Sequence, residues 1–212
     1  MKPPHVQYAE LVRAGPNGLF SRGDLDRLHQ HVEDGIAGSD LLRDLGASSV
    51  IDVGSGGGVP GLQLAIELPT ATVHLVESQQ WKAEFLLTCA RALDLESRVS
   101  IHPVRAEEAD QAVGREQLDA GTARALAAPL VVAEYLSPLV RVGGHLILWS
   151  TTTQAADPTV APHELLGLGE PRIVACPTPL RADGARIVWP KVAPCTVRVP
   201  RRVGVAARKP LR

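Results

Sequence analysis

A cluster of glycines constrains this chain more than any other feature of its sequence. Five of the eight residues from Gly54 to Gly61 are glycine, and they directly follow the short apolar stretch Val50-Ile51-Asp52-Val53. A loop without Cβ atoms between a strand and a helix lets the backbone approach a ligand closely. The segment therefore predicts a ligand-binding loop at the end of a first β-strand.

The rest of the chain alternates between apolar strands and helices. Strands are expected at residues 50–53, 72–76, 99–104, 118–123 and 145–149, and helices at residues 62–68, 79–95, 107–113 and 129–140. This alternation predicts an α/β fold, with a parallel sheet, helices on both faces and right-handed crossovers. Two later strands, at residues 172–175 and 185–190, have no helix between them and predict a hairpin at the sheet edge.

Residues 1–48 form a separate helical segment that is expected to pack on the core, and residues 49–212 form the ligand-binding domain. In the helical segment, Ser21 is a candidate N-cap for a helix at residues 25–32. A second short helix is expected at residues 40–45, ended by Gly46.

Composition restricts the class of protein. The chain has 212 residues, of which 45% are hydrophobic and 21% charged, as in an ordinary soluble domain. Its three cysteines lie far apart, which argues against a disulfide framework or a structural zinc site. No secretory signal is visible, and the longest apolar stretch, residues 125–142, is interrupted by prolines and charges. A cytoplasmic protein without a membrane segment or a bound metal is expected.

The glycine loop admits more than one nucleotide ligand. Gly56, Gly58 and Gly61 match the spacing G-x-G-x-x-G, which makes an NAD-dependent oxidoreductase one alternative. Asp52 precedes the glycines and would repel a phosphate, and Pro60 removes an N–H from the helix start. A phosphate-binding P-loop is excluded because no Lys-Ser/Thr pair follows.

One acidic residue lies near the end of each of the first three predicted strands. Asp52 lies in the first strand just before the glycines, Glu77 ends the second strand, and Glu107 comes shortly after the third. An acid at the position of Glu77 can accept hydrogen bonds from both ribose hydroxyls. Three acids suit a cationic nucleoside better than a phosphorylated one, which favours S-adenosylmethionine, with its ammonium and sulfonium groups and no phosphate.

With these residues in view, the sequence resembles the glucose-inhibited division protein B (RsmG) family of 16S ribosomal RNA guanine-N7 methyltransferases. The matching segments are residues 50–67, 75–87, 105–109, 122–130 and 199–212. The Pro60-Gly61 pair within the glycine loop is specific to the family, and the ending Pro200-Arg201-Arg202 with Lys209-Pro210-Leu211 is a second match.

The resemblance implies a Rossmann-like class I methyltransferase fold. Its sheet would have seven strands, mostly parallel, with an antiparallel C-terminal edge strand. It implies S-adenosylmethionine as methyl donor, S-adenosylhomocysteine as product, and 16S rRNA or the small ribosomal subunit as partner of a monomeric enzyme. By position, the cofactor-binding residues would be Gly54, Val59, Glu77, Ala106, Glu107 and Arg124, with Asp52, Gly56 and Gly58 shaping the pocket.

Two positions depart from the family pattern. Trp149-Ser150-Thr151 stands where the family has Lys-Gly, and Gln30 stands where it often has Arg before His31. Both departures remove positive charge that would face RNA. One alternative is therefore a nonenzymatic RNA-binding or ribosome-assembly factor that retains the cofactor pocket, and another is a methyltransferase for a small molecule.

The C-terminal segment carries the sequence evidence for RNA. Residues 185–212 contain eight lysines or arginines and no acidic residue, a distribution that attracts phosphate. The candidate RNA-binding residues are His31, Arg124, Arg198, Arg201, Arg202, Arg208 and Lys209. Because N7 of neutral guanine already holds a lone pair, its methylation needs no general base, and no catalytic residue is predicted.

Overall fold

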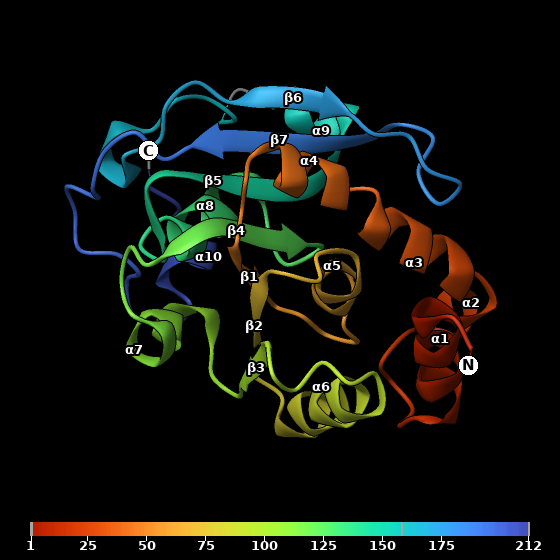
Figure 1. Ribbon diagram of the computed structural model, residues 1–212. Coiled ribbons are helices and arrows are strands. Elements are labelled where there is room, and N and C mark those ends of the chain that lie inside the picture. Colours follow the sequence, from red (N-terminus) through yellow and green to blue (C-terminus); the bar gives the residue numbers. More distant parts are fainter. Residues whose placement is uncertain (1, 158, 212) are drawn as a thin grey trace.

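The computed structural model describes residues 2–157 and 159–211 (Figure 1). Its centre is one seven-stranded sheet in the order β3-β2-β1-β4-β5-β7-β6. The strands are β1 (Ser49–Val53), β2 (Thr72–Val76), β3 (Val99–His102), β4 (Leu118–Arg124), β5 (Val140–Thr151), β6 (Arg172–Ala175) and β7 (Gly184–Pro190).

The first five strands are parallel, as their alternation with helices predicts. β7 runs antiparallel to both β5 and β6, which confirms the expected late hairpin. The antiparallel strand differs from expectation in its place, because β7 lies inside the sheet and β6 forms the edge. Residues on β7 are consequently covered on both sides, with six of its seven residues buried.

Alternate residues of each strand supply two hydrophobic cores on opposite faces of the sheet. On one face, Val50 packs with α1 (Pro4–Ala14), α3 (Leu28–Ile36), α4 (Ser39–Asp44), α5 (Gly61–Glu67) and α6 (Gln80–Ala92). On the other face, Ile51 packs with α7 (Ala109–Val113) and α8 (Pro129–Leu136). Figure 1 shows α5 and α6 on one side of the sheet and α7 and α8 on the other.

Short helical turns complete the chain. They are α2 (Arg22–Asp26), η1 (Ala106–Glu108), α9 (Thr152–Ala155), η2 (Glu164–Leu166) and α10 (Val205–Arg208). The last of these packs against α8, where Ala206 is fully buried beside Val131 and Tyr135.

Local sequence explains where several elements end. The helix expected at residues 25–32 divides at Arg27 into α2 and α3, while Ser21 caps α2 by accepting a hydrogen bond from the backbone N–H of Asp24. The helix after β4 ends at Leu136 rather than at residue 140, because Pro138 lacks the N–H that a further helical turn requires. β3 likewise stops before Pro103.

Register brings the ligand-binding loops together. Val53 at the end of β1 pairs with Val76 on β2, and Asp52 pairs with Thr122 on β4. Because parallel strands end at the same sheet edge, the loops after β1, β2, β3 and β4 converge there. The chain order reverses between β1 and β4, and this crevice is where open α/β sheets bind ligands.

Candidate functional site

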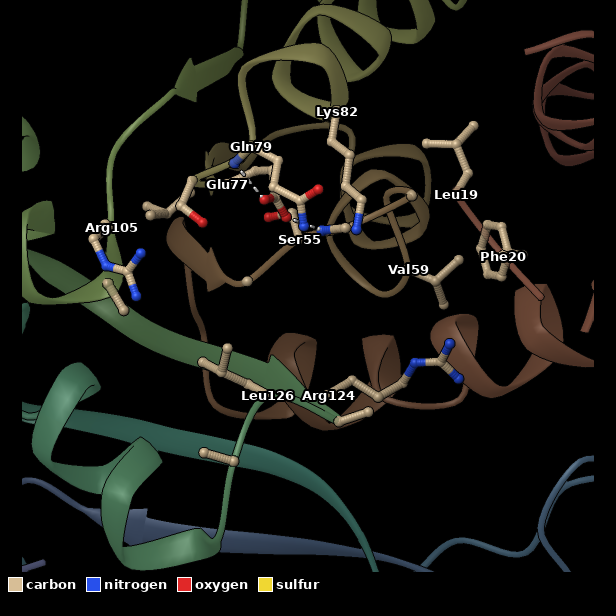
Figure 2. A pocket seen from close by; sticks show the side chains of 18 of the residues that line it. Leu19, Phe20, Ser55, Val59, Glu77, Gln79, Lys82, Arg105, Arg124 and Leu126 are labelled. Atoms are coloured by element: carbon tan, nitrogen blue, oxygen red, sulfur yellow. Dashed lines mark hydrogen bonds between the residues drawn. The ribbon is translucent and has the colours of Figure 1, made fainter. Parts of the chain in front are cut away.

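A cavity of about 790 Å³ opens at this edge of the sheet (Figure 2). Eight of the residues singled out in the sequence line it: Gly54, Gly56, Val59, Glu77, Ala106, Glu107, Arg124 and His31. The N-terminal helical segment closes one side, where Leu19 and Phe20 reach the cavity. Its volume lies within the range of pockets that hold whole nucleoside-sized ligands.

The glycine loop after β1 turns sharply under this cavity. Gly54, Gly56 and Gly58 all have positive φ angles, of 76°, 55° and 102°. At Gly54 a Cβ would also lie 2.6 Å from the side chain of Leu126, so another residue would require this side chain to move. The glycines therefore set both the backbone path and the close packing of two ligand-binding loops.

Glu77 presents a buried carboxylate to the cavity directly after β2. One of its oxygens accepts a hydrogen bond from the backbone N–H of Gly56 at 3.0 Å, and the other accepts from the N–H of Gln79 at 2.7 Å. Figure 2 shows this carboxylate beside Ser55 and Gln79. Since a carboxylate has about four acceptor positions, two remain for hydroxyl groups of a ligand.

Asp52 does not face the cavity, which corrects the expectation of three acids around one ligand. Its carboxylate is 1% exposed and accepts hydrogen bonds from the backbone N–H of Gly61 and the hydroxyl of Thr122, both at 3.2 Å. Burial raises the pKa of Asp52 to about 6. Its place behind the glycine loop ties the start of α5 to β4. Of the three acids expected around the ligand, Glu77 and Glu107 line the cavity, and Asp24 of the N-terminal helical segment lines it too.

Glu107 connects the cavity to the C-terminal segment. Its Oε1 accepts a hydrogen bond from the backbone N–H of Gly204 at 2.8 Å and one from the hydroxyl of Tyr135 at 3.3 Å. Ala207, two residues into α10, also lines the cavity. The end of the chain thus folds back beside the loop that follows β3.

Arg124, at the end of β4, belongs to a buried network of charges. Its guanidinium donates to the carboxylate of Asp34 at 2.9 Å and to Nδ1 of His31 at 3.0 Å. Asp34 is fully buried and also pairs with Arg186 at 3.3 Å and Arg181 at 4.0 Å. This arrangement fixes the direction of the Arg124 side chain toward the N-terminal side of the cavity.

The partners of His31 define its protonation. A guanidinium only donates, so Nδ1 of His31 accepts from Arg124, and Nε2 carries the proton that it donates to Asp24 at 3.1 Å. Burial, with the nearby positive charge of Arg124, lowers the pKa of His31. His31 is consequently neutral near pH 7 and contacts one terminal nitrogen of the Arg124 guanidinium, while Asp34 contacts the other.

The basic residues of the C-terminal segment are divided between the core and the surface. Arg186 and Lys191, which are among the eight cations of this segment, are each 1% exposed, so they are not available to a ligand outside the protein. Arg201 forms two hydrogen bonds, at 2.6 and 2.8 Å, with the fully buried Glu134. The exposed cations are Arg198, Arg202, Arg208 and Lys209, while Arg212 lies outside the described residues.

Sequence reasoning missed several side chains of the site. Asp34 lies one helical turn after His31, so the spacing i, i+3 carries a signal that both face the same side. Lys82 on α6 and Arg181 before β7 also line the cavity. Arg181 has no local signal, because it stands in a loop whose position depends on the β6–β7 hairpin.

Two further findings concern the described residues as a whole. None of their helices is both long and apolar enough to span a bilayer. Within the same residues, no three His, Cys, Asp or Glu side chains gather in a way that would hold a metal ion.

The strand order, the antiparallel β7 and the cavity over the glycine loop define a Rossmann-like class I methyltransferase fold. Solved structures agree with this fold. An O-methyltransferase from Bacillus cereus in complex with S-adenosylhomocysteine has a TM-score of 0.64 at 15% identity, covering 90% of this chain and 92% of that one. A methyltransferase from Geobacter sulfurreducens has a TM-score of 0.62 at 15% identity, covering 90% and 91%.

The chain belongs to the rRNA small subunit methyltransferase G (GidB) family, whose model matches residues 6–166. It is similar to the ribosomal RNA small subunit methyltransferase G of Syntrophomonas wolfei, with 35% identity over 92% of each chain. It is also similar to that of a Roseiflexus species, with 40% identity over 77% of this chain and 71% of the relative. The resemblance in the sequence is thereby confirmed.

Proposed function

We propose that this protein transfers a methyl group from S-adenosylmethionine to N7 of a guanine in 16S ribosomal RNA, in the cytoplasm. The observation that carries the proposal is the buried Glu77 carboxylate, held by the glycine loop at the cavity of a chain that belongs to this family. The relatives' names refer to the RNA of the small ribosomal subunit.

The donors and acceptors at the cavity fit this cofactor. Glu77 has acceptor positions for both ribose hydroxyls, and the close approach of the glycine loop leaves room for the ligand beside the backbone. In this proposal Gly54, Gly56, Val59, Glu77, Ala106, Glu107 and Arg124 hold the cofactor. Asp52 and Gly58 do not contact the cofactor in this proposal but fix the conformation of the glycine loop. Residues 1–48 cover the domain formed by residues 49–212.

Bound S-adenosylmethionine supplies an electrophilic methyl group on its sulfonium ion. N7 of guanine offers a lone pair at neutral pH, so the protein's contribution is alignment and exclusion of water, which is worth up to ~7–11 kcal/mol in favourable cases. Arg124, clamped between His31 and Asp34, is a rigid donor for this alignment. Exposed Arg198, Arg202, Arg208 and Lys209 supply positive charge for the RNA backbone.

Calorimetric titration with S-adenosylhomocysteine tests the cofactor part of the proposal. Glu77→Gln replaces one acceptor oxygen by an amide NH2 group, which cannot accept a hydrogen bond from a backbone N–H or a ribose hydroxyl. We expect the affinity for S-adenosylhomocysteine to fall roughly ten- to a hundredfold, as for loss of a charged hydrogen bond. Glu84→Gln, at an exposed position on α6, is the matched control and should bind like the wild type. Equal affinity of wild type and Glu77→Gln would contradict the assignment of Glu77.

The acceptor part is tested with small ribosomal subunits from a strain that lacks the gene. Incubation with the protein and S-adenosylmethionine should create a site of N7-methylguanosine, detected by chemical strand scission of the 16S rRNA. Binding of the cofactor without any new scission site would refute the methyltransferase activity on this RNA and would leave a cofactor-binding assembly factor.

A further inference from the structure

A second, smaller cavity adjoins the cofactor cavity at the ends of β4 and β5. Its volume is about 200 Å³, and it shares Leu126, Arg181 and the alanines on either side of Leu126 with the larger cavity. Pockets for whole drug-sized ligands begin at roughly 300 Å³, so this space suits one ring system rather than a second nucleoside. The shared residues place its opening toward the cofactor.

Most of the residues that line the small cavity are apolar, and its polar side chains are Ser150, Gln154 and Arg181. Val132, Leu148 and Trp149 are among its apolar lining residues. Gln154 on α9 accepts a hydrogen bond from the Ser150 hydroxyl through its amide oxygen at 2.8 Å, which leaves the amide N–H groups to donate. Arg181 contributes a guanidinium, which has donors only.

We infer that this small cavity receives the acceptor guanine, and that Gln154 and Arg181 select it by donating hydrogen bonds to its O6. The inference rests on the proposed function and names the base-reading residues of that activity. Guanine presents O6 and N7 as neighbouring acceptors, whereas adenine presents an amino donor beside N7. Donors at the cavity therefore favour guanine and turn its N7 edge toward the shared opening.

The geometry also explains how a base of a folded RNA reaches the cofactor. Enzymes that act on a base commonly take it out of its stack into a fitted pocket. The small cavity lies at the sheet edge, and Arg181 is held there by the charge of the buried Asp34 at 4.0 Å. The two reading residues come from α9 and the loop before β7.

Two variants test the inference, with initial rates of methyl transfer to unmethylated small ribosomal subunits as the readout. Gln154→Glu keeps the size of the side chain but replaces its donor by an acceptor, and Arg181→Met removes the guanidinium. Each is expected to lower kcat/KM for the subunit roughly tenfold or more, the size of a lost base contact. For Gln154→Glu, whose side chain lines only the small cavity, the affinity for S-adenosylhomocysteine and the melting temperature should stay at wild-type values. Arg181 lines both cavities, so Arg181→Met is assayed at a saturating concentration of S-adenosylmethionine.

Thr153→Ala is the matched control, because Thr153 is exposed on the same helical turn and does not line the cavity. It should methylate subunits like the wild type. If the wild type is active and both Gln154→Glu and Arg181→Met retain its kcat/KM, the inference is overturned while the proposed function stands. If the wild type itself methylates no subunit, the proposed function fails first. Should Arg181→Met lower the melting temperature, Gln154→Glu alone decides.

Discussion

At the scale of single residues, the buried Asp34 holds several side chains of the site in place. It is fully buried, and its carboxylate pairs with Arg124 and Arg186. Its backbone carbonyl accepts hydrogen bonds from the indole N–H of Trp149 at 2.7 Å and from Arg186 at 2.9 Å. The guanidinium of Arg186 also stacks on the Trp149 ring, 4.6 Å from its centroid.

Replacing Asp34 by Asn should destabilise the protein by about 3–5 kcal/mol, because two buried guanidinium groups would lose their counter-charge. Urea unfolding followed by circular dichroism measures the loss. Asp26→Asn, at an exposed position on α2, is the control and should change stability by less than about 0.5 kcal/mol. A stability of Asp34→Asn equal to that of the control would show that the ion pairs are energetically neutral.

The same residue shows what a sequence reveals about a site and what it does not. The glycines and Glu77 could be predicted, because the glycines directly follow the first strand and Glu77 directly follows the second. Asp34 could not be assigned as the partner of Arg124, which lies 90 residues away in the sequence. Only the folded sheet brings α3 and the end of β4 together.

At the scale of elements, the C-terminal segment is both a structural clamp and a basic surface. Arg201 pairs with the buried Glu134 of α8, Arg115 donates to the carbonyl of Val199 at 2.7 Å, and Gly204 donates to Glu107. The sequence predicts its basic character correctly. The contacts of this segment with the rest of the protein could not be predicted. The carboxylates that bind it, Glu107 and Glu134, lie far away in the sequence, and no sequence pattern identifies them as its partners.

Arg201 and the adjacent Arg202 should therefore behave differently when each is replaced by Ala. Arg201→Ala leaves Glu134 buried without its partner and should cost about 3 kcal/mol of stability. Arg202 is exposed, so Arg202→Ala should leave the urea midpoint unchanged and weaken RNA binding. The dependence of log affinity on log salt should become shallower by about 0.9 for each lost phosphate contact.

Filter binding to 16S rRNA over a range of salt concentrations, together with urea unfolding, separates these two roles. Equal stability of both variants would show that the Arg201–Glu134 pair contributes nothing to folding. A salt dependence unchanged in Arg202→Ala would remove Arg202 from the RNA-binding surface. The exposed Arg13 of α1 offers a control arginine outside the C-terminal segment.

At the scale of the whole molecule, alternation of strands and helices determined most of the architecture. Both faces of the sheet are covered, and the side chains of successive strand residues point to opposite faces, so Val50 and Ile51 belong to different cores. The position of β7 between β5 and β6 could not be predicted from the sequence. Both β6 and β7 are short strands, and only tertiary packing determines which one lies inside the sheet.

The pH dependence of global stability follows from groups that the sheet buries. His74 on β2 and His102 on β3 lie in contact, with Nδ1 of the first 3.0 Å from Nε2 of the second, and burial lowers the pKa of each below 6.5. The unfolded chain then binds more protons than the folded protein as the pH falls through 6.5, so stability is lost in that direction. Burial of Asp52 has the opposite effect, because its pKa of about 6 lies above the unfolded value of 3.8. The folded protein therefore binds more protons at Asp52 than the unfolded chain does, and stability is gained as the pH falls from 6 toward 3.8.

We therefore expect the urea midpoint to fall between pH 7.5 and pH 6, before the contribution of Asp52 opposes the trend. Each histidine contributes a slope of at most about 1.4 kcal/mol per pH unit. The double variant His74→Gln, His102→Gln removes both groups and should reduce the slope in this range, while His31 and His145, whose pKa values burial also lowers, continue to contribute. Asp52→Asn should retain the loss above pH 6 and lack the opposing gain below it. A double histidine variant with the wild-type slope would show that the pair is protonated in the folded protein as readily as in the unfolded chain.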